Sequence, residues 1–267
     1  MFLKADNIKS AHAFSTRVGG VSSLSYTKSL NLAFDRGDDE QTVIKNLEIF
    51  GKAAGFDSRK VISLPQIHSD IIYKVDGRDA GKGYYIRDNL CEGDGYITNS
   101  PDVVLGVKSA DCVPILFECF ENTSRGEKII AVGAVHAGWR GSVKGIAPKC
   151  VRILCEEYGV NPKNIRVAIG PCIHKCCFEV GEDFVSEFES ALGRELASEF
   201  IFPSSKEGKF YCDLVSLNQR LLTDAGVLPE NIQIIDRCTC CEPEKFYSHR
   251  YSGGLRGTML SVIHMGQ

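Results

Sequence analysis

The sequence predicts a mixed α/β (α+β) fold in one domain that covers residues 1–267. Short apolar runs alternate with helical apolar patterns along the whole chain, which is typical of this class. The sequence contains no internal repeat, no low-complexity tract and no Pro/Ser-rich linker that would divide it. A chain of 267 residues is also long enough to bury one large core.

The expected strands are the short apolar runs. The run at 129–135, Ile-Ile-Ala-Val-Gly-Ala-Val, has no polar alternation and therefore predicts a strand buried on both faces. Further strands are expected at 11–16, 61–67, 71–75, 94–98, 103–107, 113–119, 165–169, 231–236 and 259–264.

The expected helices are the segments with apolar residues at a spacing of three to four. They cover 40–54, 143–158 and 182–200, the last broken around Gly193. A further helix begins after Asp213, a typical N-cap residue, and ends near Gly226.

Charge and composition exclude several classes of function. The chain has 31 basic and 34 acidic residues and a formal net charge of −3, which argues against binding nucleic acid or an anionic membrane surface. No apolar signal region and no run long enough to span a membrane is present. Twelve cysteines without a secretion signal indicate reduced thiols, metal ligands or catalysis, so we expect a cytoplasmic protein.

The turn after the predicted central strand carries several chemically active residues. The strand brings His136 to its end, and Gly138, Arg140 and Gly141 follow just before a helix. Free N–H groups at the start of that helix, with Arg140 beside them, would suit an anion such as phosphate. The alternative is that the glycines only shape a tight turn and that Trp139 packs in the core.

Three residues that are distant in sequence could form a metal site. His68 follows an apolar run, Cys112 lies between two predicted strands, and His136 ends the central strand, so all three lie at the ends of elements. Two imidazoles and a thiolate are suitable zinc ligands, and three protein ligands with an open position are typical of catalytic zinc. Water bound there would have its pKa lowered toward roughly 7. Alternatively, each side chain merely packs or makes a hydrogen bond.

Two groups of cysteines form a second candidate metal site. Cys238 and Cys241 have zinc-knuckle spacing, and Cys172 and Cys176 could supply the other pair of a structural zinc site. Cys177 and Cys240 lie within the same two groups. The alternative is that these thiols fill crowded turns as small apolar groups.

At these residues the sequence resembles the bacterial YfiH/YlmD-type family, once named laccase-domain or multicopper polyphenol oxidase proteins and related to the mammalian purine nucleoside enzyme FAMIN. The resemblance covers nearly the whole chain. The C-terminal part departs from the family pattern at Tyr251 and at Leu255, which precedes Arg256. The matching segments are 12–22, 29–32, 66–68, 94–95, 110–112, 136–141, 169–172, 177–180, 238–239 and 247–250.

The resemblance implies a fold of packed mixed β-sheets with helices outside. It also implies that His68, Cys112 and His136 bind one zinc ion. The implied activities are phosphorolysis of adenosine, inosine and S-methyl-5′-thioadenosine, and deamination of adenosine. The partners would then be purine nucleosides and phosphate, and the protein would be a monomer or a small homo-oligomer.

Positions within these motifs suggest roles for four further residues. In deamination, water activated by zinc would attack C6 of the purine, and Asp111 is the candidate acid–base group because it adjoins Cys112. Arg17 and Arg140 are the candidates for phosphate binding. Asn31 is the candidate for binding the ribose hydroxyl groups.

Three other functions remain open from the sequence. A copper polyphenol oxidase could use the same two histidines and cysteine, but the three methionines adjoin no ligand motif and no His-x-His pair is present. A cysteine hydrolase could use Cys112 with a histidine. A non-enzymatic binding module could be stabilised by zinc in the Cys172/Cys238 cluster.

Overall fold

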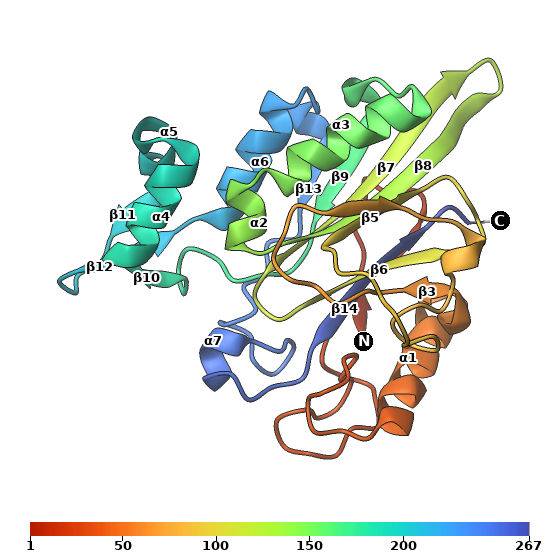
Figure 1. The fold of residues 1–267 in the computed structure, drawn as a ribbon, viewed down its shortest axis with the longest axis horizontal. Helices are drawn as coiled ribbons and strands as arrows, with labels where there is room; N and C mark the ends of the chain where they lie inside the picture. The colour runs from red at the N-terminus through yellow and green to blue at the C-terminus, as the bar shows by residue number, and fades with distance from the viewer. Residues whose placement is uncertain (267) are drawn as a thin grey trace.

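The computed structural model describes residues 1–266, in which two β-sheets pack face to face between outer helices (Figure 1). The first sheet has the order β1 (Phe2–Leu3), β2 (Ala11–Ser15), β14 (Met259–His264), β6 (Val104–Ser109) and β3 (Val61–Ile62). The second has the order β13 (Ile232–Ile234), β9 (Ile165–Ile169), β7 (Val113–Thr123), β8 (Gly126–Ala137), β5 (Gly95–Thr98) and β4 (Ile72–Lys74).

Apolar side chains from both sheets meet in the layer between them. Phe14 and Leu105 of the first sheet belong to the same buried cluster as Tyr96, Leu116 and Val132 of the second. Alternate residues of these strands therefore point into a shared core, as expected for stacked sheets.

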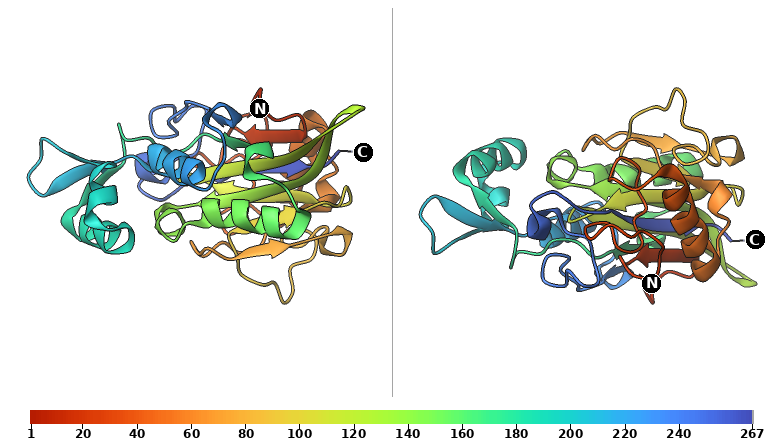
Figure 2. Two further views of the ribbon diagram at one scale, coloured as in Figure 1. Left: turned by 90° about the horizontal axis from the view of Figure 1, so that it is seen from above. Right: turned by 90° about the horizontal axis from the view of Figure 1, so that it is seen from below.

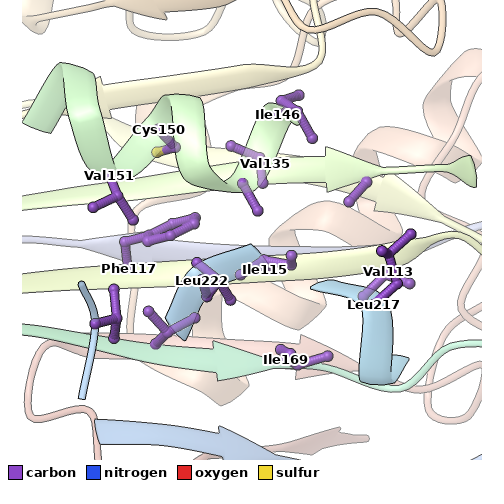
Figure 3. Packing of buried hydrophobic residues seen from close by; sticks show 14 of the residues in the cluster. Val113, Ile115, Phe117, Val135, Ile146, Cys150, Val151, Ile169, Leu217 and Leu222 are labelled. Carbon is purple, nitrogen blue, oxygen red and sulfur yellow. The ribbon is translucent and has the colours of Figure 1, made fainter. Parts of the chain in front are cut away.

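Helices cover the outer face of each sheet. Helix α1 (Glu40–Ala54) buries Val43, Leu47 and Phe50 against the first sheet. Helices α3 (Ile146–Tyr158) and α6 (Leu214–Asp224) cover the second sheet, where their apolar residues pack on Phe117 and Ile115 (Figure 3). The resulting order of layers is helix, sheet, sheet, helix.

A third, small sheet forms a lobe at one end of the molecule (Figure 2). It consists of β10 (Glu179–Gly181), β12 (Lys209–Cys212) and β11 (Ile201–Pro203), with α4 (Glu182–Leu192) and α5 (Arg194–Ser198) beside it. Val180, Phe188 and Phe200 of this lobe belong to the cluster under α3 and α6, so its core continues that of the main sheets. The remaining helices are α2 (Trp139–Val143), α7 (His249–Ser252) and 3₁₀ turns η1 (Ser58–Lys60), η2 (Gly77–Asp79), η3 (Pro162–Asn164) and η4 (Pro229–Asn231).

The predicted fold class is confirmed. Strands β10, β11 and β12 of the small sheet were not expected, and two predicted elements differ clearly in extent. The helix expected at 143–158 is interrupted at Gly145, whose φ of +75° is left-handed backbone, so α2 ends at Val143 and α3 begins at Ile146. The strand expected at 61–67 stops after Ile62 because the following residues form the loop that carries His68. Among the described residues, no helix is both long and apolar enough to cross a membrane.

Two local predictions about helix ends are confirmed. Gly193, with a φ of +82°, separates α4 from α5. The carboxylate of Asp213 accepts a hydrogen bond from the backbone N–H of Ser216 and so caps α6. The last residue of this helix is Asp224, and its C-cap is Ala225, one residue before the predicted Gly226.

Candidate metal centre and active site

His68, Cys112 and His136 meet at one end of the second sheet. One donor atom from each residue lies within 4.8 Å of the other two. Cys112 Sγ is 3.7 Å from Nε2 of His68, and the two imidazole rings are 4.9 Å apart between centroids. The predicted convergence of these three residues therefore occurs in the structure.

Strand register brings these distant residues together. Pro114 of β7 pairs with His136 of β8, so Cys112, two residues before Pro114, lies beside the end of β8. His68 lies on the loop between β3 and β4, and β4 pairs with β5, which in turn pairs with β8. Since β8 is antiparallel to both of its neighbours, the site does not follow the rule for the carboxyl edge of parallel strands.

Asp94, which immediately precedes β5, holds both histidines in place. Its carboxylate is completely buried and accepts a hydrogen bond from Nδ1 of His136 at 2.8 Å. The same carboxylate accepts the backbone N–H groups of His68 at 3.1 Å and Ser69 at 2.7 Å. It thereby fixes the loop in which His68 has a left-handed φ of +59°. Since His136 uses Nδ1 for Asp94, its Nε2 is left for a metal ion.

Gly138 leaves the space that His68 needs. A Cβ atom at this position would lie 2.6 Å from Cδ2 of His68 and 3.2 Å from Sγ of Cys112. Its backbone angles, φ −61° and ψ 164°, are accessible to any residue. Glycine is therefore required here because the side chains of His68 and Cys112 lie so close to residue 138, and not because of the backbone conformation of the turn.

The side chains of the centre stabilise one another's charged forms. Burial would raise the pKa of the Cys112 thiol, but His136 and His68 beside it lower the pKa to about 6. Burial would lower the pKa of His136, but the Cys112 thiolate and Asp94 raise it to about 9. Burial likewise opposes ionisation of Asp94, whose pKa His136 and Ser69 nevertheless lower to about 2. Cys112 is thus a thiolate near neutral pH.

The donor set fits one soft or borderline divalent ion. A thiolate and two imidazoles, one of them oriented by a carboxylate, are ligands that zinc prefers, and three protein ligands leave a coordination position open. The sequence has six histidines, of which two belong to this group. A cluster of several copper ions would require more imidazole ligands than the group supplies.

Two cavities meet at this centre. Their volumes are about 440 Å³ and 340 Å³, and both are lined by His68, Ala110, Cys112 and Arg256. Both volumes lie in the range of small-molecule sites. The three candidate ligands therefore lie where a bound small molecule could reach both cavities.

The two cavities differ in chemistry. The larger one has cationic side chains from Arg36, Lys108 and Arg256, with Asp35 as the acidic residue among its lining. The smaller one has an apolar and aromatic wall of Trp139, Ile173, Phe178 and Leu214. Its remaining lining includes the polar side chains of Asp111, His249 and Arg250. We refer to them below as the cationic cavity and the aromatic cavity.

Asp111 lies beside the centre, but its carboxylate is already engaged. Oδ1 accepts a hydrogen bond from Oγ1 of Thr239 at 2.6 Å, and Oδ2 accepts one from the backbone N–H of Arg250 at 2.7 Å. Its backbone has a φ of +97°, and its carbonyl accepts the N–H of Ile173. These contacts are those of a residue that positions the loops around Cys112.

Arg140 and Arg17 do not line either cavity at the centre. Arg140 stacks on Trp139 and lies 3.6 Å from Glu187, with about half of its side chain exposed. Arg17 lies over Tyr247 and donates hydrogen bonds to the carbonyl groups of Lys28 and Pro243. The expected contact of these arginines with phosphate at the centre does not agree with this placement.

Asn31 is a structural residue in this fold. It is completely buried, and its amide donates hydrogen bonds to the carbonyl of Ala33 and to the carboxylate of Asp38. Its side-chain oxygen accepts the backbone N–H of Thr258 at 3.0 Å. The expected contact with ribose does not fit, because Asn31 exposes no atom that a ligand could reach.

The structure adds residues to which the sequence analysis gave no role. Arg256 lines both cavities, and within the described chain its buried Nε atom has no hydrogen-bond partner. Asp94 lies in segment 94–95, which matches the family pattern, so this match could have identified it. Arg36 and Lys108 had no local signal, because only the packing of distant loops brings them to the centre.

The fold and this centre define a class of protein. Residues 11–266 match the family model described as multi-copper polyphenol oxidoreductase laccase, and the chain belongs to this family. The crystal structure of YlmD from Geobacillus stearothermophilus superimposes with a TM-score of 0.88 at 33% identity, covering 100% of this chain and 96% of that one. A Bacillus licheniformis YfiH structure gives a TM-score of 0.85 at 32% identity, covering 95% and 92%.

Several curated relatives carry names of enzymes. Purine nucleoside phosphorylase YlmD of Bacillus subtilis is 34% identical, over 94% of this chain and 87% of its own length. Adenosine deaminase RL5, from an unknown prokaryotic organism, is 32% identical over 97% of this chain and 96% of its length. Purine nucleoside phosphorylase LACC1 of the mouse is 33% identical over 95% of this chain, which spans about half, 55%, of that relative.

Proposed function

We propose that this protein is a zinc-dependent enzyme that acts on purine nucleosides. The observation that carries the proposal is that His68, Cys112 and His136 meet where an aromatic and a cationic cavity join. Relatives that match nearly the whole chain are named purine nucleoside phosphorylase and adenosine deaminase, which supports the same class of substrate.

The aromatic cavity suits the purine ring. Trp139 and Phe178 line it, and Ile173 and Leu214 extend its apolar surface. Planar aromatic side chains bind a heterocyclic ring by stacking, and an apolar pocket excludes water from its faces. The ring would therefore lie on this side of the three ligands.

The cationic cavity suits phosphate. Arg36, Lys108 and Arg256 line it, and the buried Nε of Arg256 would gain a hydrogen-bond acceptor from a bound anion. Burial and the nearby charge of Arg36 lower the pKa of Lys108 to about 8, so Lys108 is mainly cationic at neutral pH. We assign phosphate binding to these three residues instead of Arg17 and Arg140.

Phosphorolysis breaks the C1′–N9 bond and forms a C1′–O bond to phosphate. With the base in the aromatic cavity and phosphate in the cationic cavity, the bond that breaks lies near the junction of the two. His68, Cys112 and His136 would hold the metal there, and Asp94 would keep the ring of His136 in position. A bound zinc ion supplies Lewis-acid activation of an oxygen ligand at neutral pH. The same site would serve adenosine, inosine and S-methyl-5′-thioadenosine.

For deamination, adenosine would bind at the same site in a different orientation. C6 of the ring, rather than C1′ of the ribose, must then face the three ligands. Phosphate is not a reactant in this step, so the residues of the cationic cavity would contribute less to it than to phosphorolysis. We therefore expect loss of a cation from that cavity to raise the ratio of deamination to phosphorolysis.

The test is an assay of purified protein with adenosine, with and without phosphate, together with metal analysis. We expect adenine and ribose 1-phosphate only when phosphate is present. Inosine should form in both cases, and with phosphate part of it should be converted further to hypoxanthine. Cys112→Ser should abolish both reactions and remove one equivalent of zinc. Cys91→Ser, which changes an exposed cysteine outside both cavities, is the matched control and should retain them.

Other outcomes would identify the alternative functions. Activity that survives removal of metal but is lost on alkylation of Cys112 would indicate a cysteine hydrolase, for which a thiolate at neutral pH is equally suited. Turnover of phenols with an intense visible band after copper loading would indicate a copper oxidase. Absence of turnover of any purine nucleoside by correctly folded, zinc-loaded protein would contradict the proposed function.

A further inference from the structure

A second group of potential metal ligands lies outside the centre described above. Cys176, Cys177, Cys238 and Cys241 place their four Sγ atoms within 4.8 Å of one another. The distances are 3.3 Å from Cys177 to Cys241, 3.6 Å from Cys176 to Cys241 and 3.8 Å from Cys176 to Cys177. We call these residues the cysteine quartet.

The quartet is built from two turns that follow neighbouring parallel strands, β9 and β13. In the first turn, the N–H of Cys177 donates to the carbonyl of His174 at 2.9 Å. In the second, the N–H of Glu242 donates to the carbonyl of Cys238 at 3.2 Å. A backbone bridge between Cys172 and Cys238 holds the two turns side by side. Each turn therefore presents two sulfur atoms to the same point.

The spacing of the sulfur atoms matches a single tetrahedral ion. Zinc–sulfur bonds of about 2.3 Å in a tetrahedron place neighbouring sulfur atoms about 3.8 Å apart. The three distances among Cys176, Cys177 and Cys241, 3.3–3.8 Å, are close to this edge length, and Sγ of Cys238 lies within 4.8 Å of all three. An iron–sulfur cluster distributes its four cysteines over two or more iron atoms, so its cysteine sulfurs cannot all lie this close together.

The surroundings also suit a thiolate site. The backbone N–H of His174 points to Sγ of Cys238 at 3.5 Å, which is the kind of donor that supports a metal-bound sulfur. Cys176 and Cys241 are exposed, and Cys177 is partly exposed. The sulfur atoms of the quartet are therefore accessible to an ion from solution, although Cys238 itself is buried.

We infer that Cys176, Cys177, Cys238 and Cys241 bind a structural zinc ion that is separate from the metal centre at His68, Cys112 and His136. Four cysteine ligands close the coordination shell, so this ion has no open position for a substrate. Binding releases the remaining thiol protons and links the two turns. Cys177 takes the place that the sequence analysis gave to Cys172, which is completely buried.

This ion would stabilise one wall of the active site. Ile173 and Phe178, on either side of the first turn, line the aromatic cavity. Thr239, in the second turn, donates a hydrogen bond to Asp111, next to Cys112. Loss of the ion would therefore loosen the aromatic wall and the backbone around Cys112. This effect on turnover rests on the proposed function, whereas the zinc site itself does not.

The first experiment counts zinc per chain in the full-length protein and in cysteine variants. We expect two ions in the wild type, one in Cys241→Ser and one in Cys112→Ser. Cys240→Ser, which removes a cysteine of the same turn outside the quartet, is the matched control and should keep two. A wild-type content that Cys241→Ser leaves unchanged would overturn the inference, as would loss of both ions in Cys112→Ser alone.

A second measurement keeps the test decisive if Cys241→Ser fails to fold. Wild-type and Cys112→Ser protein are loaded with Co²⁺, and the absorption spectrum is recorded. We expect the intense sulfur-to-cobalt bands of a tetrathiolate site in both proteins. Their absence would overturn the inference. A disulfide within the quartet would also overturn the inference. It would lower the mass of the protein by about 2 Da, and reduction would restore the original mass.

The outcomes separate this inference from the proposed function. If the centre at Cys112 binds no metal, the wild type holds one ion and Cys112→Ser also holds one, while Cys241→Ser holds none. If only the quartet fails, Cys112→Ser holds none and the activity assay with nucleosides still succeeds.

Discussion

At the scale of single residues, the centre depends on a carboxylate that does not itself face the cavities. Asp94 accepts hydrogen bonds from Nδ1 of His136 and from the backbone of the loop that carries His68. It therefore sets the orientation of two of the three candidate ligands. Its effect on a bound ion is transmitted through these residues, which makes Asp94 a positioning residue.

Replacing Asp94 with Asn should weaken metal binding at this centre. The amide keeps the shape of the side chain but loses the negative charge and one acceptor, so the ring of His136 is held less firmly. Loss of such a partner lowers metal affinity about 10–100-fold. Zinc titration with a chelator of known affinity measures the change, and a fall in kcat/KM should accompany it.

Asp70→Asn is the control for this substitution. Asp70 lies on the same loop, where it pairs with Lys149 at 2.7 Å and lines neither of the two cavities. Its replacement should leave the zinc affinity as in the wild type. Equal zinc affinities for the wild type and the Asp94 variant would remove the positioning role.

Lys108 should make phosphate binding depend on pH. Burial, together with the charge of Arg36, lowers its pKa to about 8, so Lys108 is cationic below this pH and neutral above it. The KM for phosphate should therefore rise as the pH increases from 7 to 9. In Lys108→Met the KM should already be high at pH 7 and should change less over this range. The check is the ratio of KM values for variant and wild type at each pH.

The ratio of KM values removes the effect of the ionisation of phosphate itself, because this effect is the same for both proteins. Lys149→Met, a lysine that lines neither cavity, should show the wild-type dependence. A ratio that stays constant from pH 7 to 9 would exclude Lys108 from the phosphate site.

At the scale of elements, the start of α2 determines how closely the chain approaches the centre. Gly138 precedes this short helix, and a Cβ atom there would clash with His68 at 2.6 Å. The clash involves an imidazole ring held by its backbone, not the end of a flexible chain. The glycine is therefore required by the neighbouring loop.

Gly138→Ala should displace His68 and lower zinc affinity at the centre at least tenfold, as loss of support for a ligand does. The protein should remain folded, because the backbone angles of residue 138 suit alanine. Zinc content after dialysis, with circular dichroism to monitor folding, measures both effects.

Gly181→Ala is a matched control, because Gly181 also precedes a helix with extended backbone angles. A Cβ atom there would come no closer than 3.7 Å to Nζ of Lys209. Unchanged zinc content is expected for this variant. Wild-type zinc content in Gly138→Ala as well would show that His68 is not constrained at this point.

At the scale of the whole molecule, a buried charge network joins the N-terminal segment to the second sheet. Arg166 of β9 contacts Glu118 of β7 at 2.8 Å and also Glu127 of β8. The Glu118 side chain is completely buried and accepts the backbone N–H groups of Lys9 and Ser10, just before β2 of the first sheet. The network therefore links both sheets.

Arg166→Met should lower the free energy of unfolding by about 3–5 kcal/mol, because it leaves the Glu118 carboxylate buried without its cation. Urea unfolding followed by circular dichroism measures this change. Arg152→Met is the control: the exposed pair between Arg152 and Glu156 contributes about 0.3–0.5 kcal/mol. Similar losses for both variants would show that the buried network adds no more than an exposed pair.

Much of the fold could be predicted from the sequence because its signals are local. The apolar run at 129–135 identified the strand that became β8, and the residues around Gly193 and Asp213 marked helix boundaries. The strand at 61–67 was overextended, since its apolar residues also fit a buried loop. Local patterns do not distinguish these two cases.

The candidate site could likewise be predicted only in part from the sequence. Their residue types made His68, Cys112 and His136 candidate ligands, but their spacing forms no local motif, and it was the resemblance to a known family that implied a single site. The assignments of Arg17, Arg140 and Asn31 relied on position within motifs. Each of these side chains is instead engaged by groups that only the fold brings near.

The sequence by itself determined the mixed α/β class and most of the helices and strands, and its resemblance to a known family indicated the three candidate ligands of the centre. The tertiary structure alone decided that Asp94 holds the histidines, that Arg36, Lys108 and Arg256 supply the cations, and that Cys177 rather than Cys172 completes the quartet. Periodicity and capping act over a few residues, whereas these contacts depend on the register and packing of strands and loops far apart in the chain.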